Sequence, residues 1–481
     1  MRSSIQSGLL LATLVAPVVS AERVLGAYIF TRHGDRTAKI LGNTQLTDLG
    51  YREVFDAGSF YHNRYVDSDS DKHIERLNDT YAIAKQINAS APADAVLQNS
   101  ATGFLQGVYP PVPNASQKLG NGTTVTTPLG GYQLIQLSSV ASGKNSEDSS
   151  WLQGSSGCNK ATLSSDAYYA SDSYNDLLKS TQGFYQSLTP MLNSTFSSSD
   201  ISFKNAYTIF DYLNVGYIHN SSAEFPHEAD YTAEVRQQLI SLAGTHEFNL
   251  AYNESDPVRA IDGAVWIGQM LSSFNEIIES KGTKSMLNVQ FGSYGTFMSF
   301  WGLTQMPAAS VNFTGIPDYA SSMSLELVTN ATGTDFPSED EISVRFMFHN
   351  GTMTGSDEPT VFPMFGQSET VLPWSDFSSQ ASKVGVTSNG QWCAMCGNTD
   401  GKCASFASSS GSGSASASHT AGSGGMSRAV AGVIGAMVTL AVVLGLEALF
   451  FLVGGFRIAK RNKGGPGMGA AAEVADDKSL N

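Results

Sequence analysis

Two long apolar segments limit which part of this chain can fold in water. The first, Gly8–Val19, follows a positive charge at Arg2 and ends in the small residues Val19-Ser20-Ala21, a pattern typical of a secretory signal peptide over residues 1–21. The second, Ala429–Phe456, would reach about 42 Å as a helix at about 1.5 Å per residue, enough to cross a bilayer. The folded part is therefore expected within residues 22–403.

The residues around the second apolar segment predict its orientation. Basic side chains follow it directly, at Arg457, Lys460, Arg461 and Lys463. With a signal peptide in front, such a flank predicts a single-pass type I protein with residues 457–481 in the cytosol. A buried core helix and a lipid-linked anchor are the weaker alternatives, the latter because a mostly polar tail follows. The carboxyl of Glu447 is expected to be protonated or near the headgroups.

The composition of the remaining sequence agrees with a surface location. A Ser/Gly-rich stretch over 404–428 predicts a flexible stalk in front of the span. Charged residues make up only 15% of the chain, and glycans on acceptor sequons would replace charge as the solubilising device. The sequons begin at Asn78, Asn88, Asn114, Asn121, Asn193, Asn220, Asn253, Asn312, Asn330 and Asn350.

The cysteines and the net charge exclude further classes of protein. In an oxidising compartment Cys158, Cys393, Cys396 and Cys403 predict two disulfides. Three pairings are open, and each joins Cys158 to the C-terminal cluster. The Cys393-x-x-Cys396 spacing could indicate zinc or redox chemistry, but there is no second metal-binding pair. The net charge of −15 disfavours a nucleic-acid partner.

Hydrophobic patterning predicts an α/β protein. The β-branched run Val24–Thr31 indicates a buried strand, and 285–291, 322–328 and 342–349 indicate three more. Helical spacing marks 46–65, 166–192, 231–242 and 262–280. Strands at both ends of the sequence with helices between them predict one sheet with a helical insertion over roughly 110–260.

The chemical signal is Arg32-His33-Gly34-Asp35-Arg36, where the first strand ends. Ligands bind at that edge in open α/β sheets. Arginine side chains can hold a phosphate through bidentate contacts, and a histidine between them can attack phosphorus to form a phosphohistidine. The alternative is a plain surface turn, with Asp35 only orienting or balancing the arginines; a catalytic acid role for Asp35 is the less favoured reading.

Further segments make the chain similar to the histidine acid phosphatases, the acid phosphatase and phytase branch of the histidine phosphatase superfamily. Leu46-Thr47-x-x-Gly50 resembles the helix after that family's active-site loop, and Ser100-Ala101 with Phe104–Pro111 resembles a later segment. The resemblance covers roughly 22–403. It implies a mixed central sheet with helices on both faces and a smaller helical insertion domain. It also implies His33 as the nucleophile and Arg32 and Arg36 as phosphate ligands.

The second half of the family's site is altered in this sequence. The family places a His-Asp pair after a late strand, where the aspartate protonates the leaving group, and the aligned residues here are Ser293-Tyr294. Its third phosphate-binding arginine has no counterpart in Asn88–Pro92, and its motif proline is Ala38. The pairs His227-Glu228 and His246-Glu247 are weak candidates for a substitute acid, because both lie in the expected insertion.

Two functions follow from these residues. One is a membrane-anchored, secreted-side acid phosphatase that hydrolyses small phosphomonoesters, with orthophosphate as the other expected ligand. The second is a catalytically impaired pseudophosphatase, a phosphate-binding or structural cell-surface glycoprotein. The family resemblance favours the first, whereas loss of the acid, which alone removes a factor of about 10²–10⁴ in rate, favours the second. The sequence shows no metal-ligand cluster and implies no cofactor; its membrane contact would be the single C-terminal helix.

Overall fold

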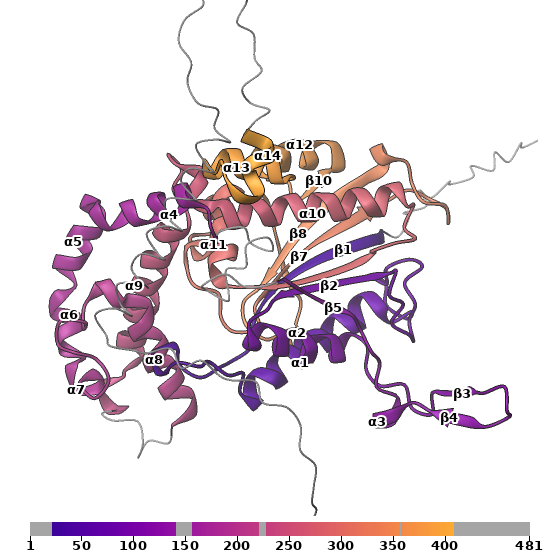
Figure 1. The fold of residues 1–481 in the computed structure, drawn as a ribbon, viewed down its shortest axis with the longest axis horizontal. Helices are drawn as coiled ribbons and strands as arrows, with labels where there is room; N and C mark the ends of the chain where they lie inside the picture. The colour runs from indigo at the N-terminus through magenta and orange to yellow at the C-terminus, as the bar shows by residue number, and fades with distance from the viewer. Residues whose placement is uncertain (1–21, 141–155, 221–227, 356, 408–481) are drawn as a thin grey trace, which may run out of the picture. The chain divides into compact units, whose positions relative to one another are not determined.

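A central strand carries the Arg32–Arg36 motif to the edge of a mixed sheet. The computed structural model describes residues 22–140, 156–220, 228–355 and 357–407 (Figure 1). The strands of the large sheet are β1 (Arg23–Arg32), β2 (Ile87–Pro92), β5 (Leu137–Val140), β6 (Leu287–Gly292), β7 (Ser322–Thr329), β8 (Ile342–His349), β9 (Thr360–Phe362) and β10 (Val371–Pro373). Their order is β10-β8-β7-β1-β6-β2-β5, with β9 paired to β8.

The direction of the strands changes at β1. Strand β1 runs parallel to β6, which runs parallel to β2, whereas β7 pairs with β1 in the antiparallel direction. The register places Arg32 opposite Gly292. The ends of β1 and β6 therefore lie side by side, which brings the residues after Arg32 next to those after Gly292.

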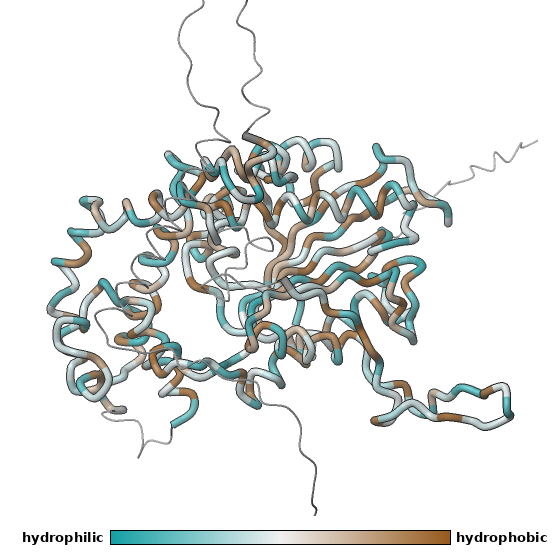
Figure 2. The backbone as a smooth tube through the Cα atoms, in the orientation of Figure 1, coloured by the Kyte–Doolittle hydropathy of each residue, from teal (hydrophilic) through white to brown (hydrophobic). Residues whose placement is uncertain are grey.

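Alternation along β1 divides the core between the two faces of the sheet. Tyr28 and Phe30 face one cluster, and Ala27 and Ile29 face the other, as a period of two requires. Helices α10 (Ile261–Glu279), α11 (Tyr294–Leu303) and α12 (Trp374–Val384) cover the first face, and α1 (Asp48–Tyr61) and α2 (Ala95–Val108) cover the second. Apolar residues gather on the central strands in Figure 2. The predicted mixed sheet with helices on both faces is confirmed.

A separate group of helices forms a third core. These are α5 (Asp172–Ser180), α6 (Gln182–Ser187), α7 (Thr189–Leu192), α8 (Ala206–His219) and α9 (Ala233–Ala251). The preceding helix α4 (Asn159–Asp166) contributes Ala161 to the first core instead. Buried aromatic and aliphatic side chains such as Tyr185, Phe203 and Leu213 hold α5 to α9 together. The helix expected over 166–192 is divided, because Ser171 caps α5 through its side chain and Pro190 starts α7.

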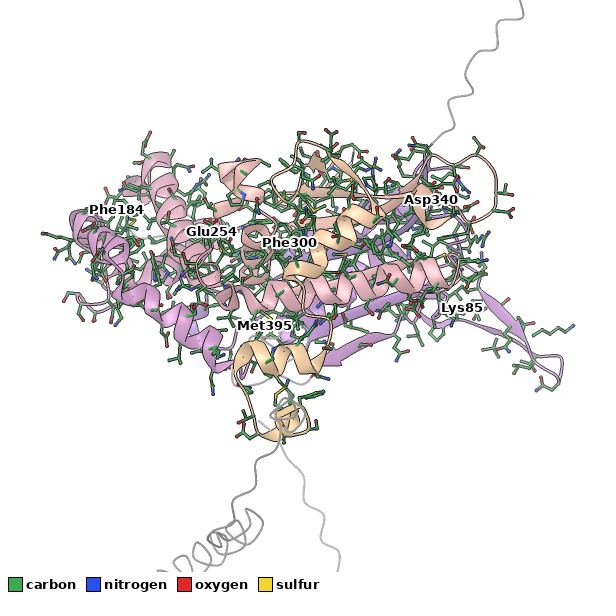
Figure 3. All side chains as sticks on the ribbon, turned by 90° about the horizontal axis from the view of Figure 1, so that it is seen from above. Lys85, Phe184, Glu254, Phe300, Asp340 and Met395 are labelled. Atoms are coloured by element: carbon green, nitrogen blue, oxygen red, sulfur yellow. A yellow bond between two sulfur atoms is a disulfide. The ribbon has the colours of Figure 1, made fainter. Side chains whose placement is uncertain are left out.

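The helical insertion is shorter than we expected. It was predicted from about residue 110, but that stretch forms the hairpin β3 (Ser116–Lys118) and β4 (Thr124–Thr126), the short helix α3 (Pro128–Gly131) and the edge strand β5. Threonine and valine in β4 and the Asn121-Gly122 turn favour a hairpin there. The hairpin stands away from the body in both views (Figures 1 and 3). The helical part begins at Asn159.

Two disulfides fix the C-terminal end of the described chain. Cys158 pairs with Cys396 across 238 residues, and Cys393 pairs with Cys403. Helix α13 (Asn389–Cys396) carries the partners near Met395 (Figure 3). The predicted stalk starts too early, because 404–407 form helix α14 (Ala404–Ala407) directly after the second disulfide.

Several predictions fall on residues that the structure does not describe. The signal peptide over 1–21, the stalk from residue 408, the span Ala429–Phe456 and the tail 457–481 all lie outside the described residues. Within the described residues, no helix is both long and apolar enough to cross a bilayer.

Candidate active site

Two glycines hold the motif loop against helix α1. A Cβ added to Gly34 would lie 2.1 Å from the Gly50 carbonyl oxygen, and one added to Gly50 would lie 2.0 Å from the Asp35 carbonyl oxygen. The backbones of the loop and of the first turn of α1 therefore touch. Thr47 caps this helix through its side chain, and Ser100 of α2 accepts a hydrogen bond from the Gly34 amide at 3.3 Å. The loop is thus fixed by backbone contacts with α1 and by a side-chain hydroxyl of α2.

His33 has the state of a nucleophile. Its Nδ1 lies 2.8 Å from the Gly34 carbonyl oxygen, which can only accept, so Nδ1 carries the proton and Nε2 keeps its lone pair. The side chain is only 2% exposed. Burial, and then the charges of Arg32 and Arg36, hold the pKa of His33 well below its usual range. The imidazole is therefore neutral at neutral pH.

Arg32 is held by a carbonyl and by aromatic rings. Its Nη1 donates to the carbonyl oxygen of Pro317. The guanidinium carbon lies 4.6 Å from the ring centre of Tyr319 and 5.5 Å from that of Tyr294. The Tyr319 ring also lies 5.6 Å from that of His33. Tyrosine rings therefore cover the arginine and the nucleophile together.

Arg36 is paired with a carboxylate from a distant helix. Its Nη2 lies 2.9 Å from Asp211 Oδ1, and its Nη1 donates to Asp211 Oδ2 at 3.2 Å. The hydroxyl of Tyr207 accepts from Nη2 at 3.0 Å, and the Thr37 carbonyl accepts from Nη1. Burial alone would lower the pKa of Arg36, but Tyr207 and Asp211 outweigh it and the pKa is raised. The guanidinium is charged, and its Nη atoms are already hydrogen-bonded within the protein.

Asp35 points toward α8 and α1. Its Oδ1 lies 2.5 Å from His219 Nε2, the last residue of α8, and accepts from Thr47 Oγ1 at 2.5 Å. Its backbone amide donates to Glu53 of α1 at 2.7 Å. Burial raises the pKa of Glu53 to about 7. Asp35 therefore holds the loop to its neighbours on α8 and α1.

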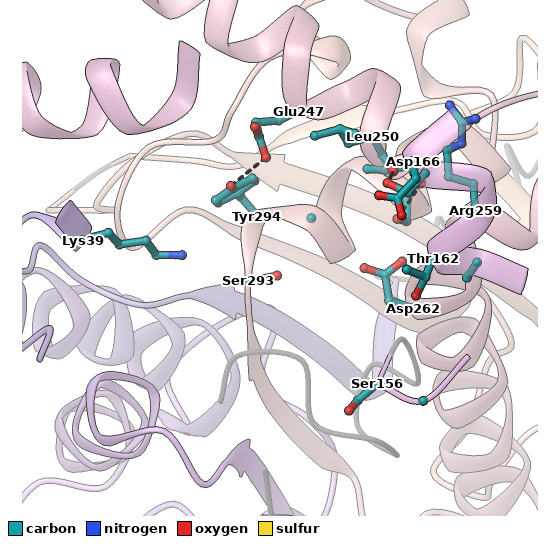
Figure 4. Close-up of a pocket in the computed structure, with 16 residues that line it drawn as sticks. Lys39, Ser156, Thr162, Asp166, Glu247, Leu250, Arg259, Asp262, Ser293 and Tyr294 are labelled. Atoms are coloured by element: carbon teal, nitrogen blue, oxygen red, sulfur yellow. Dashed lines mark hydrogen bonds between the residues drawn. The ribbon is translucent and has the colours of Figure 1, made fainter. Parts of the chain in front are cut away.

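The Ser293-Tyr294 pair lies where β6 enters α11, beside the motif loop. The Tyr294 hydroxyl donates to Glu247 Oε2 at 2.8 Å (Figure 4). The other oxygen of Glu247 lies 2.7 Å from His246 Nδ1. The Tyr294 ring also lies 4.7 Å from that of Tyr207. The weak candidate pair His246-Glu247 thus reaches the site through Tyr294, whereas His227 lies outside the described residues.

A cavity of about 480 Å³ opens beside this pair. Its wall includes Lys39, Glu247, Asp262, Ser293 and Tyr294 (Figure 4). His33, Arg32 and Arg36 do not line it. Among the described residues, no group of histidine, cysteine and acidic side chains could hold a metal ion.

Sequence reasoning missed most of the residues that surround the motif. Tyr207, Asp211 and His219 come from α8, and Tyr319 comes from the loop before β7. Their only signal in the sequence is the spacing of Tyr207, Asp211 and His219 by multiples of four, which places them on one helix face. Nothing in that spacing indicates which partner the face meets.

The family comparison agrees with this geometry. The model of the histidine phosphatase superfamily (branch 2) matches residues 25–349, from β1 to the end of β8. Among solved structures, the chain is similar to the phytase of Klebsiella sp. ASR1, with a TM-score of 0.52, 12% identity, and coverage of 76% of this chain and 95% of that one. It is also similar to the phytase of Citrobacter braakii, with a TM-score of 0.51, 12% identity, and coverage of 78% and 99%.

At this level of identity, the likeness to solved structures shows the fold alone. A comparison with curated protein sequences finds no significant match. The family model spans the motif strand, both helices that hold the loop, and the strand and helix that carry Ser293-Tyr294. The chain belongs to the histidine phosphatase superfamily, branch 2.

Proposed function

We propose that this protein is a catalytically impaired phosphatase, displayed on the luminal or extracellular side of a membrane. The single observation that carries the proposal is the ion pair between Arg36 and Asp211. Both terminal nitrogens of Arg36 contact the Asp211 carboxylate, and the side chains of Arg36 and Asp211 are 0% and 2% exposed. A phosphate ligand needs those nitrogens. His33 keeps the tautomer of a nucleophile, with Nδ1 on the Gly34 carbonyl.

The second supporting point is that the tyrosine hydroxyls around the motif are poor proton donors, whereas the carboxyl of Glu53, whose pKa is raised to about 7, accepts from the Asp35 amide. Hydrolysis of a phosphomonoester requires a proton for the leaving oxygen, and a useful donor has a pKa near the working pH. The Tyr294 hydroxyl donates to Glu247. Burial raises the pKa of both Tyr319 and Tyr207, which makes these phenols weaker acids than an exposed tyrosine.

The combined loss is large. A missing general acid costs a factor of about 10²–10⁴, and a missing charged donor to the transferring group costs about 10²–10³. If the two deficits are independent, turnover falls by about 10⁴–10⁷-fold relative to a complete site.

The location is supported by the surface chemistry. None of the ten sequon asparagines is buried; Asn78 and Asn253 are partly exposed and the others are exposed. Two disulfides suit an oxidising compartment. The terminal apolar segments supply the signal peptide and the single membrane helix. The acidic excess of residues 22–403 repels polyanions, so the substrates of the similar phytases are not proposed here.

The test is hydrolysis of an aryl phosphate by the full-length protein in mild detergent, at acidic and neutral pH. We expect a rate close to background that His33→Ala leaves unchanged. Robust turnover that His33→Ala abolishes would refute the proposal. A triple variant, Ser293→His with Tyr294→Asp and Asp211→Asn, restores the missing groups, and its rate is expected to rise about 10²-fold or more.

A further inference from the structure

Helix α8 directs several polar side chains toward the Arg32–Arg36 motif. Tyr207, Asp211 and His219 recur at multiples of four residues and therefore share a side of the helix. Tyr207 and Asp211 contact Arg36, and His219 contacts Asp35. Three residues of one helix thus contact two residues of the motif that follow the nucleophile.

The Asp211 carboxylate makes the contacts of a bound oxyanion. Its two oxygens face the two terminal nitrogens of Arg36, at 2.9 and 3.2 Å. One of these oxygens also accepts from the backbone amide of Lys39 at 2.8 Å. A planar fork of guanidinium donors with a backbone amide beside it is a set that suits a tetrahedral oxyanion equally well.

The opposite side of α8 packs into the third core, formed by the helices of the insertion. Ile209 and Leu213 pack into the helical core of the insertion, whereas the contacts to the motif are ion pairs and hydrogen bonds. His219, at the end of the helix, has a side chain that is 33% exposed. Exchange of Asp211 for an anion therefore separates polar partners and the ring contact between Tyr207 and Tyr294, and leaves the apolar core of the insertion intact.

We propose that Arg36 and the Lys39 amide form an oxyanion-binding site, and that Asp211 of α8 blocks this site in the present structure. Displacement of α8 would free the site for an external anion. The inference rests on the proposed function and adds its regulation: an event that withdraws α8 opens the site. A buried guanidinium without its carboxylate needs another anion, because an uncompensated buried charge is strongly unfavourable.

The first experiment measures binding of inorganic phosphate to the full-length protein by calorimetry. We expect weak binding to the wild type and binding at least about 10-fold tighter to Asp211→Asn, which keeps the shape of the side chain and removes its charge. The matched control is Glu279→Gln, an exposed residue at the end of α10 with the same change in charge. Addition of Arg36→Gln to Asp211→Asn is expected to reverse the gain.

Equal affinity in the wild type and Asp211→Asn would overturn the inference, and so would an equal gain in Glu279→Gln. If Asp211→Asn does not fold, the proposal is tested on the wild type instead, by measuring amide hydrogen exchange with and without phosphate. Saturating phosphate is expected to speed amide exchange in 206–219, and binding that leaves this exchange unchanged would overturn the proposal.

The two proposals can fail separately. A wild type that hydrolyses an aryl phosphate would refute the impaired phosphatase. If Asp211→Asn still binds phosphate about 10-fold more tightly, the role of α8 stands.

Discussion

Glu326 on β7 offers a sharp test of how the strand beside the motif is stabilised. Its side chain is 0% exposed and lies between two arginines: Arg64 at 2.9 Å, and Arg345, whose Nε donates to it at 3.0 Å. The Tyr65 hydroxyl also donates to it at 2.8 Å. Replacement by glutamine keeps the shape but leaves both guanidinium groups without a buried anion.

The expected cost follows from burial. Removing one partner of a buried ion pair destabilises a protein by about 3–5 kcal/mol. The matched control is Glu358→Gln, since Glu358 pairs with the same Arg64 at 3.0 Å but has a side chain that is 72% exposed. An exposed pair contributes about 0–1 kcal/mol. Both variants thus remove a carboxylate from Arg64 in two different environments, and Glu326→Gln also removes the one on Arg345.

The assay is urea unfolding of the detergent-solubilised protein at neutral pH, followed by fluorescence of the buried tryptophans. We expect Glu326→Gln to lower the free energy of unfolding by several kcal/mol and Glu358→Gln by less than about 1 kcal/mol. Equal losses in the two variants would refute the argument that burial sets the strength of the pair.

The same pair predicts a dependence on pH. Burial alone would raise the pKa of Glu326, but Arg64 and Arg345 outweigh it and hold the pKa below the ordinary value of 4.5. A carboxyl with a lowered pKa in the folded state stabilises fully above its unfolded-state pKa, and this is lost as the pH falls through the folded-state pKa. The difference between wild type and Glu326→Gln should therefore be full at neutral pH and shrink below about pH 4. A difference that persists in strong acid would contradict this origin.

Two further predictions concern the scaffold of the site. Gly34→Ala places a methyl group against the Gly50 carbonyl, 2.1 Å from its oxygen, so we expect a lower melting temperature and a looser motif loop, measured by thermal unfolding and amide exchange; an unchanged melting curve would show that the contact is not tight. Loss of the Cys158–Cys396 disulfide, which spans 238 residues, is expected to cost about 5 kcal/mol by chain entropy, against about 3 kcal/mol for Cys393–Cys403, which spans 10. Denaturant unfolding of the two double serine variants measures both, and a larger loss for the short loop would argue against chain entropy as the cause.

The sequence alone predicted the frame of the fold and the first half of the site. The apolar, partly β-branched run before Arg32 predicts a buried strand, since strands buried on both faces have near-continuous apolar sequences. The motif at its end predicts His33 as a nucleophile between two arginines. The absence of a His-Asp pair is also a property of sequence, because Ser293-Tyr294 follows a strand that the apolar pattern locates closely.

The tertiary structure decided what the two arginines contact. Asp211 lies 175 residues from Arg36 along the chain, and His219 lies 184 from Asp35. Helical spacing shows that Tyr207, Asp211 and His219 share a face, but it does not show which surface that face meets, because docking depends on the whole packing of the insertion. The elements found after residue 110 and at 404–407 differ from the expected ones for a related reason. Composition shows how polar a segment is, but it does not show which segments contact each other. The pairing of β3 with β4 and the Cys393–Cys403 disulfide are contacts of that kind.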